Sequence, residues 1–421
     1  MRVLLAVHAL PGDALGGTEL YTRDLAAALA RDHEVAVAAP TGTDVHVPGA
    51  DVFTLPSGDD ESGLSGVVCA EVDAAFADLL ARVDPDVVHL QHLKALSAGI
   101  PALCDERDVP CLLTLHDFWT VCHREQLYRP EGYPCEGPTS VEKCTNCYAA
   151  AGESETPLRP FDEEEAVVAD GAVPARPDAE TAPGRFYRRA VARRAEQLAD
   201  ARAHTDLLVA PSRFLRDAFV AFGTPPDRIR QERNGIRTAR FRDEGFDPDG
   251  PLDVAYAGRV TELKGVHLLV EAMWDVADAR CHVFGSFDPA EDDYHARLAE
   301  AAGDDVRFHG RYDDPATPYA TADVLVVPSL WYENSPLVIQ EAFAAGVPVV
   351  AADAGGMAEL VTDGEDGLLF DRSDADDLSA VLRKLADDPG RVADLRADVT
   401  APRRLDDHAD AVASLYREAR S

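Results

Sequence analysis

Two cations follow a predicted buried strand in the second half of the chain. Residues 253–257, DVAYA, read as a short apolar strand, and Gly258, Arg259 and Lys264 follow it in the segment GRVTELKG. Ligands of open α/β sheets bind at the carboxyl ends of the strands, where this loop should lie. An arginine and a lysine there suit an anion, and a diphosphate is the usual candidate. The alternative is a solvated loop, although a chain with only four lysines favours a functional one here.

Two glutamates flank a predicted helix start in the segment LWYENSPLVIQEAFAAG. Ser335 followed by Pro336 is typical of an N-cap with proline at the first helical position, and Gly346 should end the helix. Glu333 then lies in the loop before the helix and Glu341 inside it. The N–H groups at such a helix start favour an anion or hydroxyl oxygens, and a nearby carboxylate can bind sugar or ribose hydroxyls. The alternative for Glu341 is a half-buried charge paired with an arginine.

A third loop, DAGGMAELVTDG, follows the predicted strand VPVVAA. Its Gly355 and Gly356 would let the backbone come close to a ligand at the start of the next helix. One glycine pair is a weak signal. Three loops that converge on the same edge of one sheet indicate a binding site.

Short apolar strands alternate with alanine-rich helices, which predicts an α/β architecture with parallel sheets. In the first half the predicted strands are 2–9, 34–40, 86–92, 110–117 and 206–212, with helices at 18–32 and 71–83. In the second half the predicted strands are 253–258, 280–286, 306–310, 323–329, 347–353 and 367–370. No period of roughly 20–50 residues recurs, so we expect two Rossmann-like domains rather than a solenoid.

The domain boundaries follow from this alternation. We expect an N-terminal domain over 1–240, a C-terminal domain over 241–403 and a final helix over 404–421. The N-terminal domain carries a cysteine-rich loop, 118–148, and an acidic insertion, 150–184, whose composition predicts a mobile loop. The final helix has an apolar face made of Ala409, Val412, Leu415 and Tyr416.

The net charge of the chain indicates the kind of solvent in which it works, and not the reaction that it catalyses. Forty basic against 76 acidic residues give a net charge of −36, which argues against nucleic-acid binding because phosphates are neutralised by Lys and Arg. Apolar residues make up 46%, no stretch reaches the ~20 apolar residues of a membrane span, and MRVLLAVHAL reads as a strand rather than a signal peptide. We expect a cytoplasmic protein of a salt-accumulating organism such as a halophilic archaeon. An acidic mesophile enzyme is the alternative.

Four of the eight cysteines cluster in the loop 118–148. They are Cys122, Cys135, Cys144 and Cys147, the last two forming a C-x-x-C pair. Four thiolates on a Gly/Pro-rich loop match a structural zinc site, which would staple a long loop with little core of its own. An iron–sulfur cluster and free or redox-active thiols are the alternatives. The other cysteines should be small apolar packing residues, because disulfides are rare in cytoplasmic chains.

Two histidines end the predicted strand DVVHLQH at the carboxyl edge of the first sheet. His89 and His92 should lie near the pair His116-Asp117, and we expect His89, His92 and Asp117 on the acceptor side of the site. Ordinary polar edge residues are the alternative for the two histidines. A predicted arginine-rich helix, 184–203, could contact a lipid headgroup or an anionic acceptor. A solvated face is the alternative, because concentrated salt screens such attraction.

Taken together, the motifs resemble those of retaining glycosyltransferases of family 4, which have two facing Rossmann-like domains, the GT-B fold. The residues that carry the resemblance are Gly16-Gly17, His116, Ser212, Asn234-Gly235-Ile236, Gly258-Arg259, Lys264, Glu333, Glu341, Gly355-Gly356 and Glu359. The match covers nearly the whole chain apart from 150–184. It implies a C-terminal helix that crosses back to the first domain.

The resemblance also implies roles. Arg259 and Lys264 would bind the donor diphosphate, Glu341 the ribose, and Glu333 the donor sugar. The backbone of Asn334, Ser335, Pro336 and Leu337 would contact the donor sugar together with Glu333. From the first domain, Gly16 and Gly17 would approach the phosphates and His116 the donor sugar. The residues closest to catalysis would be His116, Arg259, Lys264 and Glu333.

The sequence therefore predicts a retaining transferase that moves a sugar from a nucleotide-diphosphate sugar to a glycan, a lipid-linked sugar or a small molecule. No catalytic cofactor is expected, because neither Asp-x-Asp pair, Asp84/Asp86 or Asp247/Asp249, lies at the edge that would hold a metal on the diphosphate. A nucleotide-sugar epimerase and a non-catalytic sugar-binding partner are the rivals. A dinucleotide oxidoreductase is disfavoured, because no G-x-G-x-x-G follows the first strand. The enzyme could contact the inner face of a membrane, and its oligomeric state is not encoded in any motif.

Overall fold

The computed structural model describes residues 1–11, 16–41, 44–58, 67–151 and 182–420. Two compact units form in the chain. Unit 1 contains Met1–Arg233 together with Asp406–Ser421, and unit 2 contains Asn234–Leu405. Among the described residues no helix is long and apolar enough to cross a membrane.

Unit 1 is built on a parallel sheet of seven strands in the order β3-β2-β1-β4-β5-β6-β7. The strands are β1 (Arg2–Ala6), β2 (Glu34–Ala39), β3 (Ala50–Thr54), β4 (Val87–Leu90), β5 (Cys111–Thr114), β6 (Leu207–Ala210) and β7 (Ile229–Gln231). The five predicted strands are confirmed, and all four residues of β4 are buried, as a two-sided parallel sheet requires. The edge strands β3 and β7 were not foreseen, because half-buried edge strands lack a continuous apolar run.

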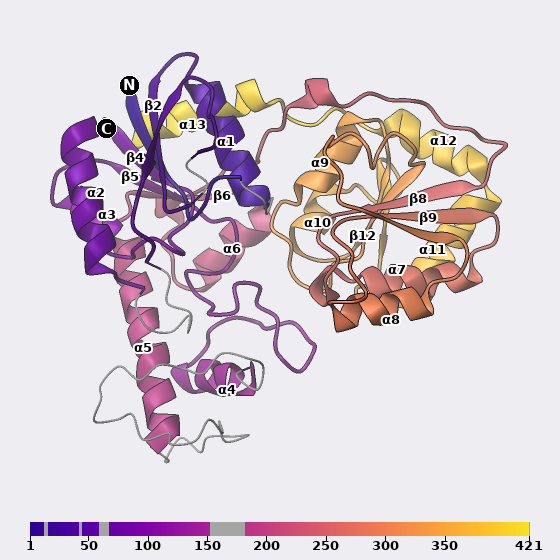
Figure 1. Cartoon of the computed structure of the whole chain (residues 1–421), viewed down its shortest axis with the longest axis horizontal. Helices are drawn as coiled ribbons and strands as arrows, with labels where there is room; N and C mark the ends of the chain where they lie inside the picture. The colour runs from indigo at the N-terminus through magenta and orange to yellow at the C-terminus, as the bar shows by residue number, and fades with distance from the viewer. Residues whose placement is uncertain (12–15, 42–43, 59–66, 152–181, 421) are drawn as a thin grey trace. The chain divides into compact units, whose positions relative to one another are not determined.

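Several helices of unit 1 lie between successive parallel strands, which need such crossover connections. The helices of this unit are α1 (Gly17–Leu29), α2 (Ala70–Val83), α3 (Ile100–Asp105), α4 (Val141–Ala151), α5 (Ala182–Ala203), α6 (Arg213–Ala221) and α13 (Leu405–Ala419). Figure 1 shows α4 lying beside the far end of α5, away from the sheet. The two helices share a small apolar cluster that includes Tyr187, Val191 and Tyr148.

The C-terminal helix α13 crosses back and packs on unit 1. Ala409, Val412 and Tyr416 of the predicted apolar face are buried, while Leu415 is half-buried. A hydrogen bond from the α1 side anchors the helix, since the Tyr21 hydroxyl lies 2.8 Å from Nε2 of the buried His408. The polar anchor and the apolar face together explain why this helix belongs to the first unit.

Unit 2 repeats the architecture with six parallel strands in the order β10-β9-β8-β11-β12-β13. All six predicted strands are present, namely β8 (Leu252–Ala257), β9 (Ala279–Phe284), β10 (Val306–Gly310), β11 (Val324–Val327), β12 (Val349–Ala352) and β13 (Gly367–Phe370). The helices are α7 (Val266–Ala272), α8 (Asp293–Ala301), α9 (Leu337–Ala344), α10 (Gly355–Leu360), α11 (Ala375–Asp387) and α12 (Pro389–Asp398). The two units thus confirm the expected pair of Rossmann-like domains with parallel sheets.

The inserted segments differ in part from expectation. Residues 152–181 of the predicted acidic insertion lie outside the described residues. The ends of the predicted loop are helical, because α4 continues to Ala151 and α5 begins at Ala182. The cysteine-rich loop is irregular only up to Ser140, after which α4 begins at Val141. Its helical turn places Cys144 and Cys147 on neighbouring positions of one face.

Candidate functional site

The loop after β8 turns sharply at Gly258, whose φ of 150° is a conformation that glycine adopts readily. The buried Tyr256 hydroxyl donates a hydrogen bond to the carbonyl oxygen of Arg259 at 2.6 Å, which fixes the loop. The Arg259 side chain is exposed. The loop therefore presents a cation at the carboxyl edge of the second sheet, as the sequence predicts.

Lys264 and Glu333 form an ion pair at the same edge. Lys264 ends the short 3₁₀ turn Glu262–Lys264, and its Nζ lies 2.5 Å from Oε1 of Glu333. The same carboxylate oxygen accepts a hydrogen bond from the Ser329 hydroxyl at 2.8 Å. Nζ also lies 5.5 Å from the ring centroid of Trp331. The structure thus brings together the lysine and glutamate that the sequence selects from segments 69 residues apart.

The start of α9 differs by one residue from the prediction. Pro336 is the N-cap, and the helix begins at Leu337, so Ser335 does not cap it. No side-chain hydrogen bond caps this helix, and the first turn is closed by the Ile339 N–H, which donates to the Pro336 carbonyl at 3.2 Å. The helix ends where predicted, since Gly346 has a φ of 71°. The first-turn N–H groups of α9 are consequently not satisfied by a capping side chain.

Glu341 lies one turn inside α9 and is half-buried. Its Oε2 accepts a hydrogen bond from the Tyr319 hydroxyl at 2.8 Å. Burial and the nearby Glu341 charge raise the pKa of Tyr319 well above its ordinary value, so the hydroxyl stays protonated and acts as donor. Tyr319 thereby holds the glutamate in one orientation.

The glycine pair at the start of α10 packs against the backbone of the loop before α9. A Cβ on Gly356 would coincide with the carbonyl oxygen of Asn334, and the Gly356 N–H donates to the Glu333 carbonyl at 2.7 Å. Gly355 has a φ of 56°. These glycines therefore allow a close approach of the protein's own backbone around Glu333, and their approach to a ligand stays a prediction.

The carboxyl edge of the first sheet carries a group of histidines. His116, just after β5, lies with Nε2 3.1 Å from Oε1 of Gln91. Burial and the neighbouring His92 lower the pKa of His116 to about 3, so the ring is neutral near pH 7. Since Oε1 is an acceptor, Nε2 carries the proton. This neutral imidazole can orient a substrate hydroxyl but does not supply a fixed positive charge.

His92 and Asp117 form a defined pair. The backbone N–H of Lys94 donates to Nδ1 of His92 at 2.9 Å, which leaves the proton on Nε2. Nε2 lies 3.3 Å from Oδ2 of Asp117, whose Oδ1 accepts the Trp119 N–H at 2.7 Å. Burial opposes ionisation of Asp117, yet the His92 interactions and the Trp119 bond outweigh it and lower the pKa of this carboxyl. His92 thus orients Asp117.

His89 is not an acceptor residue. It is 0% exposed, and Nδ1 lies 2.8 Å from the Tyr416 hydroxyl while Nε2 lies 2.7 Å from Oγ1 of Thr114. Burial lowers the pKa of His89 to about 3. Both ring nitrogens are engaged inside unit 1, so the prediction that His89 contacts the acceptor is wrong. Its side chain instead holds α13 against β5.

Two residues of this edge were missed by the sequence reasoning. His8, two residues beyond β1, lies with Nε2 3.2 Å from Oε1 of Glu19 in the first turn of α1. A Cβ on Gly16 would meet the end of the flexible Glu19 side chain. Burial raises the pKa of Glu19, but the hydrogen bonds from His8 and from its own backbone N–H together outweigh burial, so the pKa is lowered. The position of His8 after the first strand was the signal that could have identified it.

Ser212, Asp86 and Arg194 make structural contacts. Ser212 caps α6, its Oγ accepting the Leu215 N–H at 3.2 Å. Asp84 and Asp86 lie at the amino end of β4, where Oδ2 of Asp86 accepts the Arg2 N–H at 2.7 Å. This confirms that the Asp-x-Asp pair lies at the opposite edge from the histidines. Of the predicted arginine face on α5, Arg194 is buried and donates to the Trp119 carbonyl at 2.7 Å.

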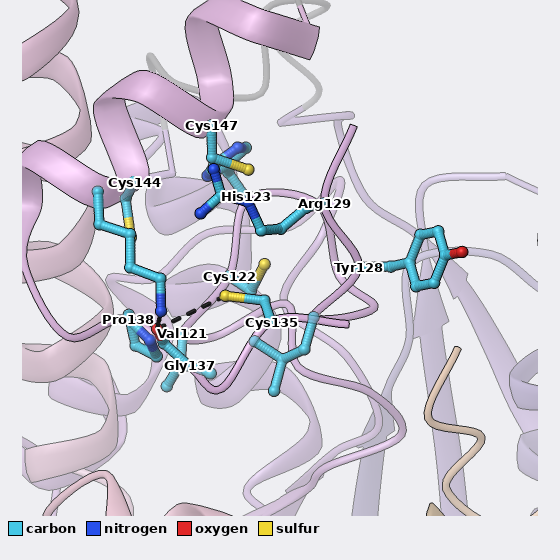
Figure 2. Close-up of a pocket in the computed structure, with 12 residues that line it drawn as sticks. Val121, Cys122, His123, Tyr128, Arg129, Cys135, Gly137, Pro138, Cys144 and Cys147 are labelled. Atoms are coloured by element: carbon cyan, nitrogen blue, oxygen red, sulfur yellow. Dashed lines mark hydrogen bonds between the residues drawn. The ribbon is translucent and has the colours of Figure 1, made fainter. Parts of the chain in front are cut away.

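The four clustered cysteines line one pocket (Figure 2). Burial raises the pKa of Cys144 to about 11 and that of Cys147 to about 12, and the neighbouring Cys122 and Cys135 thiols contribute. All four are free cysteines. In the part of the chain that the structure describes, no three His, Cys, Asp or Glu side chains already stand in an arrangement that holds a metal ion.

Comparison with known proteins identifies the family of this chain. Residues 251–388 match the family model described as glycosyl transferases group 1, and residues 15–137 match the model described as glycosyltransferase family 4. The chain is 31% identical to a D-inositol 3-phosphate glycosyltransferase of Xylanimonas cellulosilytica, over 99% of this chain and 96% of the relative. It is 27% identical to the protein of that name from Pseudarthrobacter chlorophenolicus, over 94% of this chain and 90% of the relative.

Among solved structures, Anabaena HepE in complex with UDP has a similar fold. The TM-score is 0.69 at 19% sequence identity, over 99% of this chain and 100% of HepE. HepE has also been solved with UDP-glucose, with a TM-score of 0.64. At this identity the likeness concerns the fold.

Proposed function

This chain belongs to the group 1 and family 4 glycosyltransferases, and on that premise we propose that it transfers a hexose from a nucleoside diphosphate sugar with retention of configuration. The donor binds to unit 2. The observation that carries the proposal is the Lys264–Glu333 ion pair at the carboxyl edge of the second sheet. The exposed Arg259 follows a strand at the same edge, and Glu341 is held by Tyr319 in the helix that follows Glu333.

The donor-binding roles follow from the charges. Arg259 and Lys264 bind the diphosphate and offset the charge that develops on it as the glycosidic bond breaks, which is the electrostatic assistance such a departure requires. Glu341, oriented by Tyr319, accepts hydrogen bonds from the ribose hydroxyls. Glu333 accepts them from the donor sugar. Because Glu333 already binds Lys264, the two side chains are held ready for a donor that has hydroxyls beside a diphosphate.

The acceptor binds to unit 1. Asp117, held by His92, is the best-placed carboxylate at the carboxyl edge of the first sheet to orient an acceptor hydroxyl. His116 is neutral near pH 7 and offers a hydrogen-bonding group at the same edge of unit 1. The leaving phosphate takes the acceptor's proton, so neither a carboxylate nucleophile nor a metal cofactor is assigned. The acceptor is a glycan, a lipid-linked sugar or a small polyol, and the name of the relatives makes inositol 3-phosphate the first compound to test.

The test is donor binding followed by transfer, with the full chain in concentrated KCl and excess EDTA. Calorimetry with UDP, GDP and ADP should show binding of one nucleotide, with UDP tested first because HepE binds it. The matching α-linked sugar nucleotide should then be transferred to the acceptor with an α-linkage, read from the anomeric proton coupling in the product. A β-linked product would overturn retention, and loss of donor binding on adding EDTA would overturn metal independence.

Two outcomes would overturn transfer itself. Conversion of the nucleotide sugar to its epimer without release of nucleotide would make the enzyme an epimerase. Binding of a sugar nucleotide without turnover, across a panel of polyols and glycans, would make it a non-catalytic partner. Lys264→Ala tests the site itself under each of these outcomes. If unit 2 binds the diphosphate, the variant should lose donor binding, and unchanged binding would mean that the site is misassigned.

We also propose that the enzyme works in the cytoplasm of a salt-accumulating organism and meets the inner face of a membrane through α5. The net charge of −36 supports the first point. The relatives named above are actinobacterial and lend no support to an archaeal origin. Arg188, Arg189 and Arg193 are exposed on α5, whereas Arg194 is not. Flotation with anionic vesicles at low and high KCl tests the membrane contact.

A further inference from the structure

The segment between β5 and α4 has almost no regular structure of its own. From Leu115 to Ser140, all of which the structure describes, the chain forms turns and one isolated bridge, Tyr128 with Pro134, but no helix or strand. Its side chains Phe118, Trp119 and Leu127 are buried, but the segment has no helix or strand that fixes its backbone. Small units of this kind are usually held by disulfides or by a metal. The pocket in Figure 2 lies where this segment meets α4.

Three separate pieces of chain bring sulfur to that pocket. Cys122 comes from the turn after Trp119, Cys135 from the second half of the loop, and Cys144 with Cys147 from the first two turns of α4. The i, i+3 spacing places the two helical thiols on one face. Cys135 has only a weak partner, since its Sγ lies 3.6 Å from the Gly137 carbonyl.

A nitrogen donor lines the same pocket. His123 is adjacent in sequence to Cys122, and its Nε2 is buried with no hydrogen-bond partner. The ring packs edge-on against Tyr148 of α4, with centroids 5.3 Å apart. A buried imidazole nitrogen without a partner is costly, and a metal ion is one group that would satisfy it.

We infer that this pocket is a structural zinc site, with ligands drawn from Cys122, Cys135, Cys144, Cys147 and His123. Zinc takes four sulfur or nitrogen ligands in a tetrahedron, and structural sites are closed sets of this kind. Binding requires rotation of the side chains into convergence and loss of the thiol protons to solvent. No electron transfer is involved, so the proposal needs no oxidant or reductant.

The site would hold in place the segment that follows Asp117. The Cys122 N–H donates to the Phe118 carbonyl at 2.7 Å, and the Phe118 N–H donates to the Glu125 carbonyl at 2.9 Å. This tight turn begins directly after Asp117. A metal that joins Cys122 to α4 therefore fixes the segment that carries Asp117, without itself touching substrate.

The experiment measures metal content in the full chain, purified under reducing conditions without a metal-binding tag or chelator. Elemental analysis should find one zinc per chain. After the zinc is removed with a thiol-reactive mercurial and thiols are restored, titration with Co²⁺ should give sulfur-to-cobalt charge-transfer bands and the intense visible bands of a tetrahedral ion. Cys144→Ser and Cys147→Ser should each lose most of the zinc, whereas Cys69→Ser, at the N-cap position of α2 in the same unit, should keep it.

Each other outcome overturns the proposal. Absence of zinc together with absence of cobalt bands, in a wild-type protein whose circular dichroism shows a folded chain, rules the site out even if the variants fail to fold. Iron with acid-labile sulfide would make it an iron–sulfur site. Rapid oxidation of the Cys144/Cys147 pair to a disulfide in the purified protein, with no bound metal, would make the thiols a redox pair. His123→Leu then decides between a four-sulfur and a three-sulfur set by the shift of the cobalt bands.

Discussion

Asp117 is held at both carboxylate oxygens, by the His92 ring at 3.3 Å and by the Trp119 backbone N–H at 2.7 Å. The two donors come from the segments that follow β4 and β5, which are neighbours in the sheet. The carboxylate is consequently ionised and fixed in direction at the carboxyl edge of unit 1. A fixed acceptor of this kind orients a hydroxyl group without losing side-chain entropy on binding.

Asp117→Asn should weaken acceptor use without affecting the donor. A hydrogen bond to a charged group contributes roughly 1.5–3 kcal/mol, so we expect kcat/KM for the acceptor to fall about ten- to a hundredfold. The Kd of the nucleotide, measured by calorimetry, should stay unchanged because the donor site is in unit 2. Asp217→Asn, an exposed aspartate on α6, is the control. A loss of nucleotide binding in Asp117→Asn would contradict the proposal that unit 2 binds the donor and unit 1 the acceptor.

Lys264→Ala should strongly weaken donor binding and slow transfer. The substitution removes the cation for the diphosphate and leaves the Glu333 carboxylate, whose side chain is only 8% exposed, without its counter-charge. At saturating donor, loss of one electrostatic donor costs about a hundred- to a thousandfold in kcat. Lys384→Ala on the exposed face of α11 is the matched control, and its turnover should equal that of the wild type. Normal turnover in Lys264→Ala would remove the assigned diphosphate site.

Gly356→Ala in α10 should displace the neighbouring loop that carries Glu333. The added Cβ meets the carbonyl oxygen of Asn334, a backbone atom that cannot move aside without shifting Glu333. Overpacking of this kind costs typically about 1–3 kcal/mol of folding free energy, and nucleotide affinity should fall with it. Gly303→Ala, where a Cβ meets nothing within 4 Å, is the control for urea unfolding and for calorimetry. Equal stability and affinity in both variants would show that the loop is not packed as described.

His89 should make the protein lose stability in mild acid. Its pKa is about 3 in the folded chain and 6.5 in an unfolded one, because burial disfavours the charged ring. Between these values the unfolded chain binds one more proton, so the free energy of unfolding decreases as the pH falls, by up to about 1.4 kcal/mol per pH unit.

His89→Asn removes that proton uptake. The variant should be less stable at neutral pH, because the bonds to Tyr416 and Thr114 change, yet its stability should fall less steeply with acid. Urea unfolding between about pH 5 and pH 7 measures the slope. His46→Asn, at an exposed histidine, should leave the slope as in the wild type. Identical slopes in all three proteins would mean that His89 is accessible to protons in the folded state.

Much of the donor unit could be predicted from the sequence. All six strands of unit 2 are short apolar runs followed by turn residues, and the carboxyl ends of parallel strands meet at one edge, so Arg259, Lys264 and Glu333 had to share it. The helix start at Pro336 was placed within one residue, because proline and the following apolar run carry a local signal. Local chemistry and a parallel topology suffice for this part.

The acceptor edge needed the tertiary structure. His89 and His92 are three residues apart on one strand end, yet His89 points into the interior toward Tyr416, which lies 327 residues away, and His92 points toward Asp117. The pairing of His8 with Glu19 likewise depends on how β1 and α1 meet. The alternation of side chains along the predicted strand shows that His89 and His92 lie on different faces of the sheet. It does not show which distant side chain covers each of those faces.

The sequence by itself therefore determined the α/β class, the order of the elements and the residue types at the carboxyl edge of the second sheet, because these depend on local periodicity and residue type. Only the tertiary structure decided which histidine is structural, that the Gly355-Gly356 pair packs on the protein's own backbone, and that Cys144 and Cys147 lie on a helix facing Cys122 and Cys135. Those facts depend on contacts between residues far apart in the chain, and such contacts leave no local pattern.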